Sequence, residues 1–311
     1  MKKIIALLLC VMMLGISAAV AETVGICQLV QHPALDLATQ GFRDALSAKI
    51  PDIQFDEQNA SGDSATCATI INGFVSADVA LIMANATPAL QAAVAATADI
   101  PILATSITDY ATALEMDAAT FTGVTGINVS GTTDLAPLDG QADMIAELFP
   151  EAKTVGLLYC SAEPNSLYQV NTIRGFLEAK GLTCKDFAFA DSNDVASVTQ
   201  SAVGDVDVLY IPTDNTAASV TETIAGVVIP GGLPVIAGEE GIARGCGVAT
   251  LTISYYDIGF ATGEMAAEIL LNGADVSAMP IQAAPQFTKK YNAENALALG
   301  VTIPADYEAI E

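Results

Sequence analysis

The chain has 311 residues, a formal net charge of −25 and 52% hydrophobic residues. This length permits two domains of ordinary size, and the hydrophobic content can fill their cores, so the acidic residues belong to a solvated surface. The strong negative charge disfavours nucleic acid and anionic membrane surfaces as partners.

The first 21 residues have the pattern of a secretory signal. Lys2 and Lys3 precede an apolar run from Ile4 to Ile16, and residues 17–21 end in an A-x-A cleavage pattern. The run is shorter than the roughly 20 residues that span a bilayer, which favours a cleaved signal over a membrane anchor. We therefore expect an exported mature protein that begins at Glu22 and is periplasmic or extracellular, associated with the cell envelope.

The stretch from Val24 to Leu46 predicts a strand that runs directly into a helix. Its start is mostly apolar, as is typical of a parallel strand covered on both faces, and Pro33 suits the first position of a helix. Similar units follow, with strands predicted at 53–55, 79–83 and 102–104, a helix at 64–75 and a helix from Pro88 that Thr87 would cap. This repetition predicts a doubly wound half-domain.

Residues 114–128 interrupt this rhythm with glycines and threonines, and we expect them to form the first crossing to a second lobe. Further strands are predicted at 154–159, 184–189, 206–211, 234–237 and 248–253, with helices at 141–148, 167–180, 195–203 and 217–229. An amphipathic helix at 255–273 would return to the first lobe. The expected fold class is therefore α/β, with two Rossmann-like, doubly wound lobes.

No catalytic signature is present in the sequence. His32 is the single histidine, which nearly excludes metal cages and histidine-based triads, and no Gly-rich phosphate loop occurs. Cys27 is a conceivable nucleophile, but a buried thiol is the stronger interpretation for a cysteine on a strand. We expect no enzyme activity, no metal and no cofactor, and we expect buried thiols at Cys27, Cys67, Cys160, Cys184 and Cys246.

Polar residues recur in loops at the carboxyl ends of the predicted strands, the edge at which open α/β sheets bind ligands. Each of them has an alternative interpretation as a helix cap. A cleft with hydroxyls and helix N-termini on one wall and carboxylates on the other suits a small zwitterion such as an amino acid. The candidate ligand-binding residues are Gln28, His32, Leu35, Thr87, Thr105, Ser106, Asp109, Asn165, Ser166, Tyr168, Asp214, Asn215 and Glu239.

Six separated motifs also resemble one family over nearly the whole mature chain. They are VGICQLVQHPALDLATQGF, NATPALQAAVAAT, PNSLYQV, YIPTDNTAAS, PVIAGEEGIARG and YYDIGFATGEMAAEIL. In this order they resemble the substrate-binding proteins of bacterial ABC transporters in the tryptophan/tyrosine-binding group. The resemblance implies the fold of type I periplasmic binding proteins, in which three crossings join two lobes. It places lobe I at residues 22–125 and 255–285, lobe II at 126–254, and a segment returning toward lobe II at 286–311.

The resemblance also implies roles for individual residues. The α-carboxylate of an amino acid would bind at Thr87, Thr105 and Ser106, and its ammonium would meet Asp214 or Glu239. The implied partners are an aromatic or similar amino acid and an ABC permease in the membrane, with the chain itself a monomer. Binding is expected to close the two lobes.

Two other classes of function remain open at this point. A sugar or nucleoside binder of the same fold would stack its ligand on aromatic faces, for which Tyr110, Tyr168, Tyr255 and Tyr256 are available. The absence of tryptophan weighs against that alternative. An enzyme is the third class, and the sequence offers it neither a base nor a nucleophile.

Overall fold

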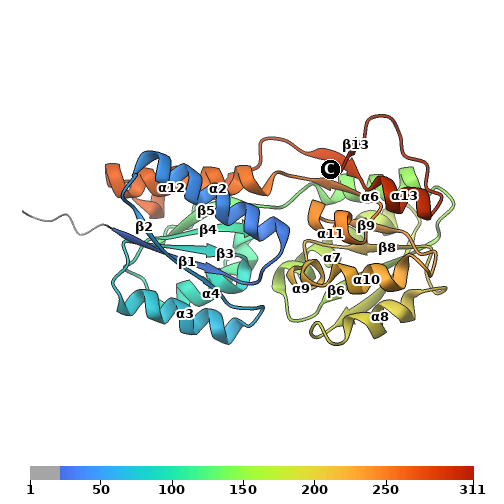
Figure 1. Ribbon diagram of the computed structural model, residues 1–311, viewed down its shortest axis with the longest axis horizontal. Helices are drawn as coiled ribbons and strands as arrows, with labels where there is room; N and C mark the ends of the chain where they lie inside the picture. Colours follow the sequence, from blue (N-terminus) through green and yellow to red (C-terminus); the bar gives the residue numbers. More distant parts are fainter. Residues whose placement is uncertain (1–21) are drawn as a thin grey trace, which may run out of the picture.

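The computed structural model describes residues 22–311, which form two lobes side by side along the long axis of the molecule (Figure 1). The expected signal sequence, residues 1–21, lies outside the described residues. Within residues 22–311, no helix combines the length and the apolar character needed to cross a membrane. Each lobe has its own sheet with helices on both faces.

The first lobe contains a six-stranded sheet whose neighbouring strands all run parallel. Helices α2 (Pro33–Lys49) and α12 (Tyr255–Asn272) cover one face, and α3 (Ser64–Ser76) and α4 (Thr87–Ala96) cover the other (Figure 1). The short helices α5 (Tyr110–Ala113) and η1 (Val276–Ala278) complete this lobe. In spatial order the strands are β11 (Gln282–Ala283), β5 (Val129–Thr133), β4 (Ile102–Ile107), β3 (Leu81–Asn85), β1 (Thr23–Gln28) and β2 (Gln54–Asn59).

The side chains of β1 show why both faces of this sheet are covered. Val24 and Ile26 belong to a buried cluster with Phe42 of α2, whereas Cys27 belongs to the cluster on the opposite face with Phe74 of α3. Successive side chains of a strand point to opposite faces, so a strand that is apolar on both needs a cover on each side.

Close packing of α12 against α2 brings a late part of the chain onto the first lobe. A Cβ atom on Gly259 would lie 2.0 Å from the carbonyl oxygen of Ala38, and one on Gly41 would lie 2.2 Å from that of Tyr256. Both distances are shorter than any real contact, so the two backbones approach closely only because these positions are glycine.

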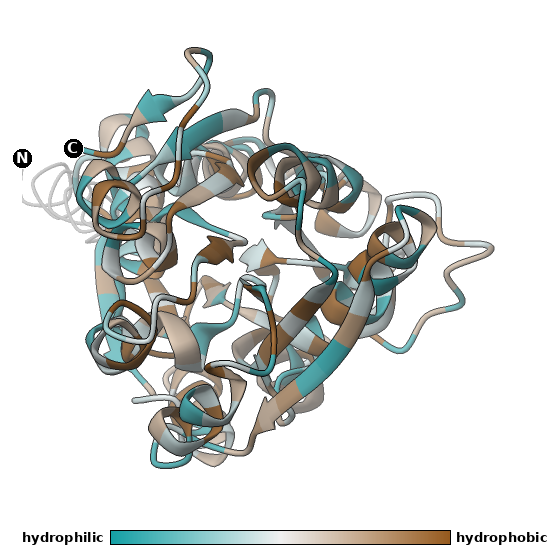
Figure 2. Ribbon diagram, turned by 90° about the vertical axis from the view of Figure 1, so that its right-hand side faces the viewer, coloured by the Kyte–Doolittle hydropathy of each residue, from teal (hydrophilic) through white to brown (hydrophobic). Residues whose placement is uncertain are grey.

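The second lobe contains a seven-stranded sheet, covered by helices on both faces. In Figure 2, which views the molecule from its right-hand end, hydrophobic residues colour several of the central strands brown. The strands in spatial order are β13 (Glu308–Ala309), β12 (Thr288–Tyr291), β10 (Ala249–Thr252), β9 (Val235–Ala237), β8 (Val208–Ile211), β6 (Thr154–Cys160) and β7 (Thr183–Phe189). The helices are α6 (Leu138–Leu148), α7 (Pro164–Ala179), α8 (Val195–Ala202), α9 (Asn215–Ser219), α10 (Thr221–Val228), α11 (Glu240–Gly245) and α13 (Ala293–Ala298).

Three segments connect the two sheets: residues 134–137 between β5 and α6, residues 253–254 between β10 and α12, and residues 284–287 between β11 and β12. The first connection corrects the sequence-based boundary after residue 125. Residues 114–128 lead to β5, which still pairs with β4 in the first sheet. The crossing to the second lobe begins only at Asp134.

The composition of β5 explains why the sequence pattern did not reveal it. Its sequence is VSGTT, with one large apolar residue, and its buried hydroxyls are satisfied by distant parts of the chain. Ser130 Oγ donates to the carbonyl oxygen of Met279 at 3.0 Å, and Thr132 Oγ1 donates to Thr105 Oγ1 at 3.0 Å. Because hydrogen bonds to distant residues stabilise this strand, it does not need the apolar run from which strands are predicted in a sequence.

Candidate functional site

A small, largely enclosed cavity lies between the lobes, where the carboxyl ends of strands from both sheets face each other. Ligands of open α/β sheets bind at this edge. The first sheet, its helices and the crossings contribute His32, Leu35, Ser106, Thr108, Asp134 and Tyr255 to the lining. The second lobe contributes Asn165, Thr213, Asp214, Asn215, Ala218 and Glu239.

His32 occupies the N-cap position of α2 and links the two lobes. Its Nε2 atom lies 3.3 Å from Asn215 Oδ1, and its buried Nδ1 atom has no hydrogen-bond partner among the described residues. Burial lowers the pKa of His32 below its usual value, against the opposing effects of Asn215 and of the nearby acids. The imidazole is therefore neutral at physiological pH and offers the cavity a hydrogen bond rather than a charge.

Ser106 lies near the end of β4, where the pairing with β5 shifts register, and it faces the cavity in a strained backbone conformation. Its φ is +59°, and its buried Oγ atom lacks a partner within residues 22–311. Ala86, at the neighbouring end of β3, also has a positive φ of 91°. A backbone conformation with positive φ costs a non-glycine residue about 1–3 kcal/mol, and such strain is concentrated at functional sites.

Asp214 is a buried carboxylate that three protein donors already occupy. Its Oδ1 atom accepts the Ala217 amide at 2.8 Å, which caps α9. Its Oδ2 atom accepts the Cys160 amide at 2.6 Å and the Ser166 hydroxyl at 2.8 Å. Burial, together with the charge of Glu163, raises the pKa of Asp214 to about 8 in spite of these bonds.

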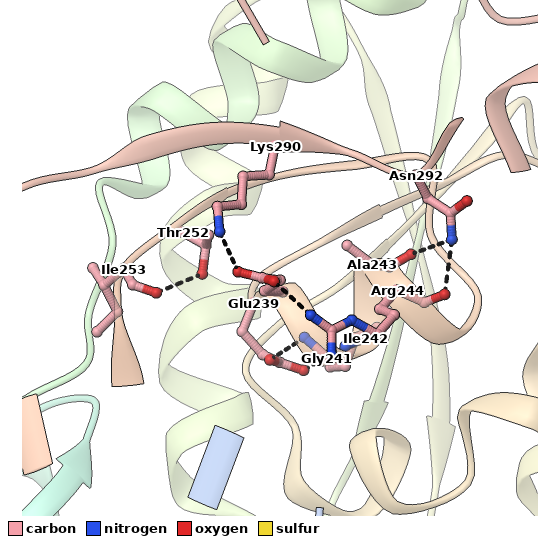
Figure 3. Close-up of polar contacts among 10 residues, drawn as sticks. Glu239, Gly241, Ile242, Ala243, Arg244, Thr252, Ile253, Lys290 and Asn292 are labelled. Atoms are coloured by element: carbon pink, nitrogen blue, oxygen red, sulfur yellow. Dashed lines mark hydrogen bonds and ion pairs between the residues drawn. The ribbon is translucent and has the colours of Figure 1, made fainter. Parts of the chain in front are cut away.

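Glu239 has a similar structural role at the start of α11. Its carboxylate accepts the amides of Gly241 and Ile242, both at 2.5 Å, as Figure 3 shows for this turn. The two cations beside it, Arg244 and Lys290, pair with Glu240 instead, at 2.8 and 2.7 Å. Burial is the main reason that the pKa of Glu239 rises to about 7.

Glu163, at the N-terminus of α7, orients two amide side chains at the cavity. Its carboxylate accepts Asn165 Nδ2 at 3.0 Å and Asn215 Nδ2 at 2.7 Å, and it also accepts the backbone amide and the hydroxyl of Thr216 at 2.8 and 2.7 Å. Because the Asn165 amide nitrogen points to this carboxylate, Asn165 Oδ1 is the free end. That buried oxygen has no partner in the described part of the chain.

Asp134 stands at the first crossing, directly after β5, and is 4% exposed. Its carboxylate accepts the Tyr255 hydroxyl at 2.8 Å and the Thr108 hydroxyl at 3.3 Å. Burial raises its pKa to about 6, although the two hydroxyls favour the charged form. Thr108 Oγ1 in turn lies 3.4 Å from Thr213 Oγ1, and Gln169 Nε2 donates to both, so this group connects the two lobes.

The charge of the lining is one-sided. Asp134, Asp214 and Glu239 all face the cavity, His32 is the single base, and the described lining residues include no lysine or arginine. Buried carboxylates are costly unless a cation or several hydrogen bonds compensate them. Hydrogen bonds from backbone amides compensate Asp214 and Glu239, whereas Asp134 accepts only two hydroxyls, so the cavity is suited to a ligand that carries a positive group.

Two hollows continue the interlobe cleft on either side of the cavity. One shares Glu239 and Tyr255 with it and is bounded by Pro33, Leu37 and Ile253. The other shares Asn215 and has an apolar wall that includes Leu29, Val30 and Pro88. Apolar surface thus adjoins the polar cavity on both sides.

The structure brings together seven of the thirteen residues proposed from sequence: His32, Leu35, Ser106, Asn165, Asp214, Asn215 and Glu239. Ser166 supports Asp214 from behind, and Tyr168 is half-buried outside the cavity lining. Gln28 accepts from Thr39 and donates to Asp36 on the α2 side, outside the lining.

Three other residues proposed from the sequence contribute to the fold rather than to the cavity lining. Thr87 does not cap α4 as predicted, because the cap position belongs to Ala86 and Thr87 is already the first helical residue. Thr105 is buried and accepts from Thr132. Asp109 caps α5 by accepting the Thr112 amide at 2.7 Å. None of the three lies in the described lining of the cavity.

The sequence-based list omitted Thr108, Asp134, Thr213, Ala218 and Tyr255. Asp134 was missed because β5 was not recognised, so no loop was expected after it. Thr213 had a usable signal, since it belongs to the PTDNT loop that supplied Asp214. The prediction of buried thiols is confirmed for Cys27, Cys67, Cys160 and Cys246, whereas Cys184 is half-buried.

Two α/β lobes with a buried polar cavity between them define a two-lobed binding protein. Residues 23–309 match the family described as ABC transporter substrate binding protein. The chain belongs to this family of solute-binding proteins, which are not enzymes.

Individual relatives agree with this assignment. The chain is 36% identical over 264 residues to a tyrosine-binding protein of Clostridioides difficile (strain R20291), covering 84% of this chain and 75% of the relative. A solved ABC domain from Streptococcus pneumonia in complex with L-Trp is 31% identical, with a TM-score of 0.88 over 93% of this chain and 100% of that one. The fold is that of type I periplasmic binding proteins, as expected.

A third relative bears on the arrangement of the lobes. The ligand-free, open structure of a substrate-binding protein with adhesive properties from Clostridium difficile is 36% identical, with a TM-score of 0.69 over 94% of this chain and 99% of that one. The more identical relative is thus the less similar in structure. As a whole, this chain therefore superposes better on the L-Trp complex than on the ligand-free, open protein.

Proposed function

We propose that this protein binds an aromatic amino acid in the interlobe cavity and delivers it to the permease of an ABC importer. The observation that carries the proposal is a set of buried polar atoms without partners in residues 22–311: His32 Nδ1 and Ser106 Oγ from the first lobe, and Asn165 Oδ1 from the second. A buried polar atom without a partner costs about 1–3 kcal/mol. A polar ligand that contacts both lobes would remove that cost.

The charge of the cavity favours an amino acid over the sugar or nucleoside alternative. Three carboxylates line it, with no lysine or arginine among the described lining residues. An ammonium group compensates such charge, whereas the hydroxyls of a neutral sugar do not. The aromatic class rests on the tyrosine-binding and L-Trp-bound relatives, and the apolar hollows beside the cavity offer surface for a ring.

The remaining parts of the proposal concern the cell. We infer that the chain is exported and cleaved before Glu22, and that it works as a monomer that presents its closed lobes to the permease. The signal-like pattern of residues 1–21 and the family assignment support these inferences.

A thermal-shift panel of amino acids, sugars and nucleosides tests the ligand class. A ligand at 100 times its Kd stabilises the folded state by about 2.7 kcal/mol, which corresponds to a melting-temperature increase of several degrees. We expect this increase with tyrosine or tryptophan and not with sugars. An increase confined to sugars or nucleosides would overturn the proposal.

Ser106→Ala tests whether the cavity is the binding site. The hydroxyl that it removes has no partner in the described chain, so stability should stay the same or rise slightly. Affinity for the amino acid should fall roughly 5- to 30-fold, the loss of one hydrogen bond of about 1–2 kcal/mol. Ser197→Ala, on the exposed side of α8, is the matched control and should change neither property. Unchanged affinity in Ser106→Ala would place the ligand elsewhere.

A further inference from the structure

We propose that Asp134 is the carboxylate that pairs with the ammonium group of the ligand, and that it makes the site select amino acids over their deaminated analogues. This inference rests on the proposed function and names a residue for the ammonium other than Asp214 and Glu239, which the sequence suggested. The evidence for it is that the three carboxylates lining the cavity have different hydrogen-bond donors.

Asp214 and Glu239 are already compensated by the protein. Asp214 accepts two backbone amides and one hydroxyl, and Glu239 accepts two backbone amides at the first turn of α11. Backbone amides at a helix start carry partial positive charge, so these carboxylates hold the ends of α9 and α11 in place. Their oxygens are directed at the protein backbone.

Asp134 lacks this compensation. Among the described residues it receives only the hydroxyls of Tyr255 and Thr108, the latter at a long 3.3 Å. It does not begin a helix, because the N-cap of α6 is Pro137. A carboxylate accepts about four hydrogen bonds, so about two positions remain, and an ammonium group has three donors to fill them. Glu239 also accepts two hydrogen bonds, but its donors are backbone amides at a helix start, whereas Asp134 has hydroxyl donors alone and is the lining carboxylate that the protein compensates least.

The pKa values of the three carboxyls agree with this assignment. Burial raises the pKa of all three carboxyls, to about 6 for Asp134, about 7 for Glu239 and about 8 for Asp214, so Asp134 has the lowest pKa of the three and ionises most readily. A ligand ammonium therefore meets a ready negative charge at Asp134.

The backbone around Asp134 fixes its position. The Asp134 amide donates to the carbonyl oxygen of Ile107 at 3.1 Å, and Thr133 Oγ1 donates to that of Thr108 at 3.1 Å, which ties the crossing to the end of β4. Tyr255, the first residue of α12, holds the carboxylate from the second crossing. Asn165 Oδ1, across the cavity, is available as a second acceptor for the ammonium when the lobes are together.

The test compares three ligands on the full mature chain by isothermal titration calorimetry: L-tyrosine, its deaminated analogue 3-(4-hydroxyphenyl)propionate, and its decarboxylated analogue tyramine. In Asp134→Asn, tyrosine and tyramine affinity should each fall roughly 30- to 3000-fold, the range measured when one partner of a buried charge pair is removed. Affinity for the deaminated analogue should change less than about threefold, because it has no ammonium to lose.

Two kinds of variant complete the design. Asp139→Asn, on the exposed start of α6, makes the same charge change five residues away and should bind like the wild type. Asp214→Asn and Glu239→Gln should keep the wild-type preference for tyrosine over the deaminated analogue, even where both affinities fall together. Asp134→Ala, which also removes the charge, replaces Asp134→Asn if that variant does not fold. We expect it to show the same loss of preference for tyrosine over the deaminated analogue as Asp134→Asn.

The informative quantity is the ratio of the affinity for tyrosine to the affinity for its deaminated analogue. The assignment is overturned if Asp134→Asn and Asp134→Ala keep the wild-type ratio, or if the ratio falls in Asp214→Asn or Glu239→Gln instead. A wild-type protein that binds no amino acid at all overturns the proposed function itself and, with it, this role of Asp134. The two failures are distinguishable, because the first leaves wild-type tyrosine binding intact.

Discussion

Asp214→Asn separates two roles that the sequence alone left open, a helix cap and a ligand partner. In the structure Asp214 accepts the amides of Ala217 and Cys160 and the hydroxyl of Ser166. These three donors already occupy its oxygens, and burial together with the charge of Glu163 raises its pKa to about 8. We therefore expect the substitution to affect stability more than binding.

The contacts give the size of the effect. Asparagine keeps one acceptor oxygen, so either the cap to Ala217 or the bond from Cys160 is lost. Losing a cap costs about 1 kcal/mol, and a buried amide without an acceptor costs about 1–3 kcal/mol. We expect about 1–2 kcal/mol of destabilisation for Asp214→Asn and about 2–4 kcal/mol for Asp214→Ala, which loses all three bonds. Ligand affinity should change less than tenfold, or about 1.4 kcal/mol.

Urea unfolding followed by circular dichroism gives the stability change, and calorimetry on the folded variants gives the affinity. The reasoning would be refuted by the opposite pattern, an affinity loss above about 30-fold in a variant as stable as the wild type. That result would identify Asp214 as the ammonium partner, because deleting a paired buried charge is expected to cost about 2–5 kcal/mol of affinity.

Four further predictions concern pH, packing and shape. Because burial raises the pKa of Asp134 to about 6, tyrosine affinity should fall about tenfold per pH unit below pH 6, and a flat profile from calorimetry between pH 4.5 and 8 would contradict this. The same raised pKa contributes stability to the unbound fold that is full below about pH 4 and is lost as pH rises through 6, which pH-dependent melting can detect. Gly259→Ala should destabilise the fold by about 1–3 kcal/mol or more, because its Cβ would meet the Ala38 carbonyl. Gly175→Ala, with open space around it in α7, should be neutral or slightly stabilising, and equal melting temperatures in the two variants would refute the packing argument. Small-angle scattering should show a smaller radius of gyration with saturating tyrosine than without it, and identical values would count against closure.

Local signals in the sequence determined much of the fold. Pro33 and Pro164 stand at the starts of α2 and α7, and the apolar runs of β1 and β8 mark strands that are covered on both faces. Loops after such strands meet at one edge of a sheet, which is why seven of the thirteen proposed residues line one cavity.

Long-range contacts decided the rest. The strand β5 is polar and is held by hydroxyl bonds to Met279 and Thr105, so no local pattern marks it, and Asp134 was hidden with it. Likewise, Asp214 looks the same in sequence whether it caps a helix or faces a ligand. Its role depends on the amide of Cys160, 54 residues away, and on burial between the lobes. Residue types and spacing determine which groups reach the cleft. The hydrogen-bond donors to each carboxylate are set only when distant segments pack together, and these donors decide which carboxylate remains available to a ligand.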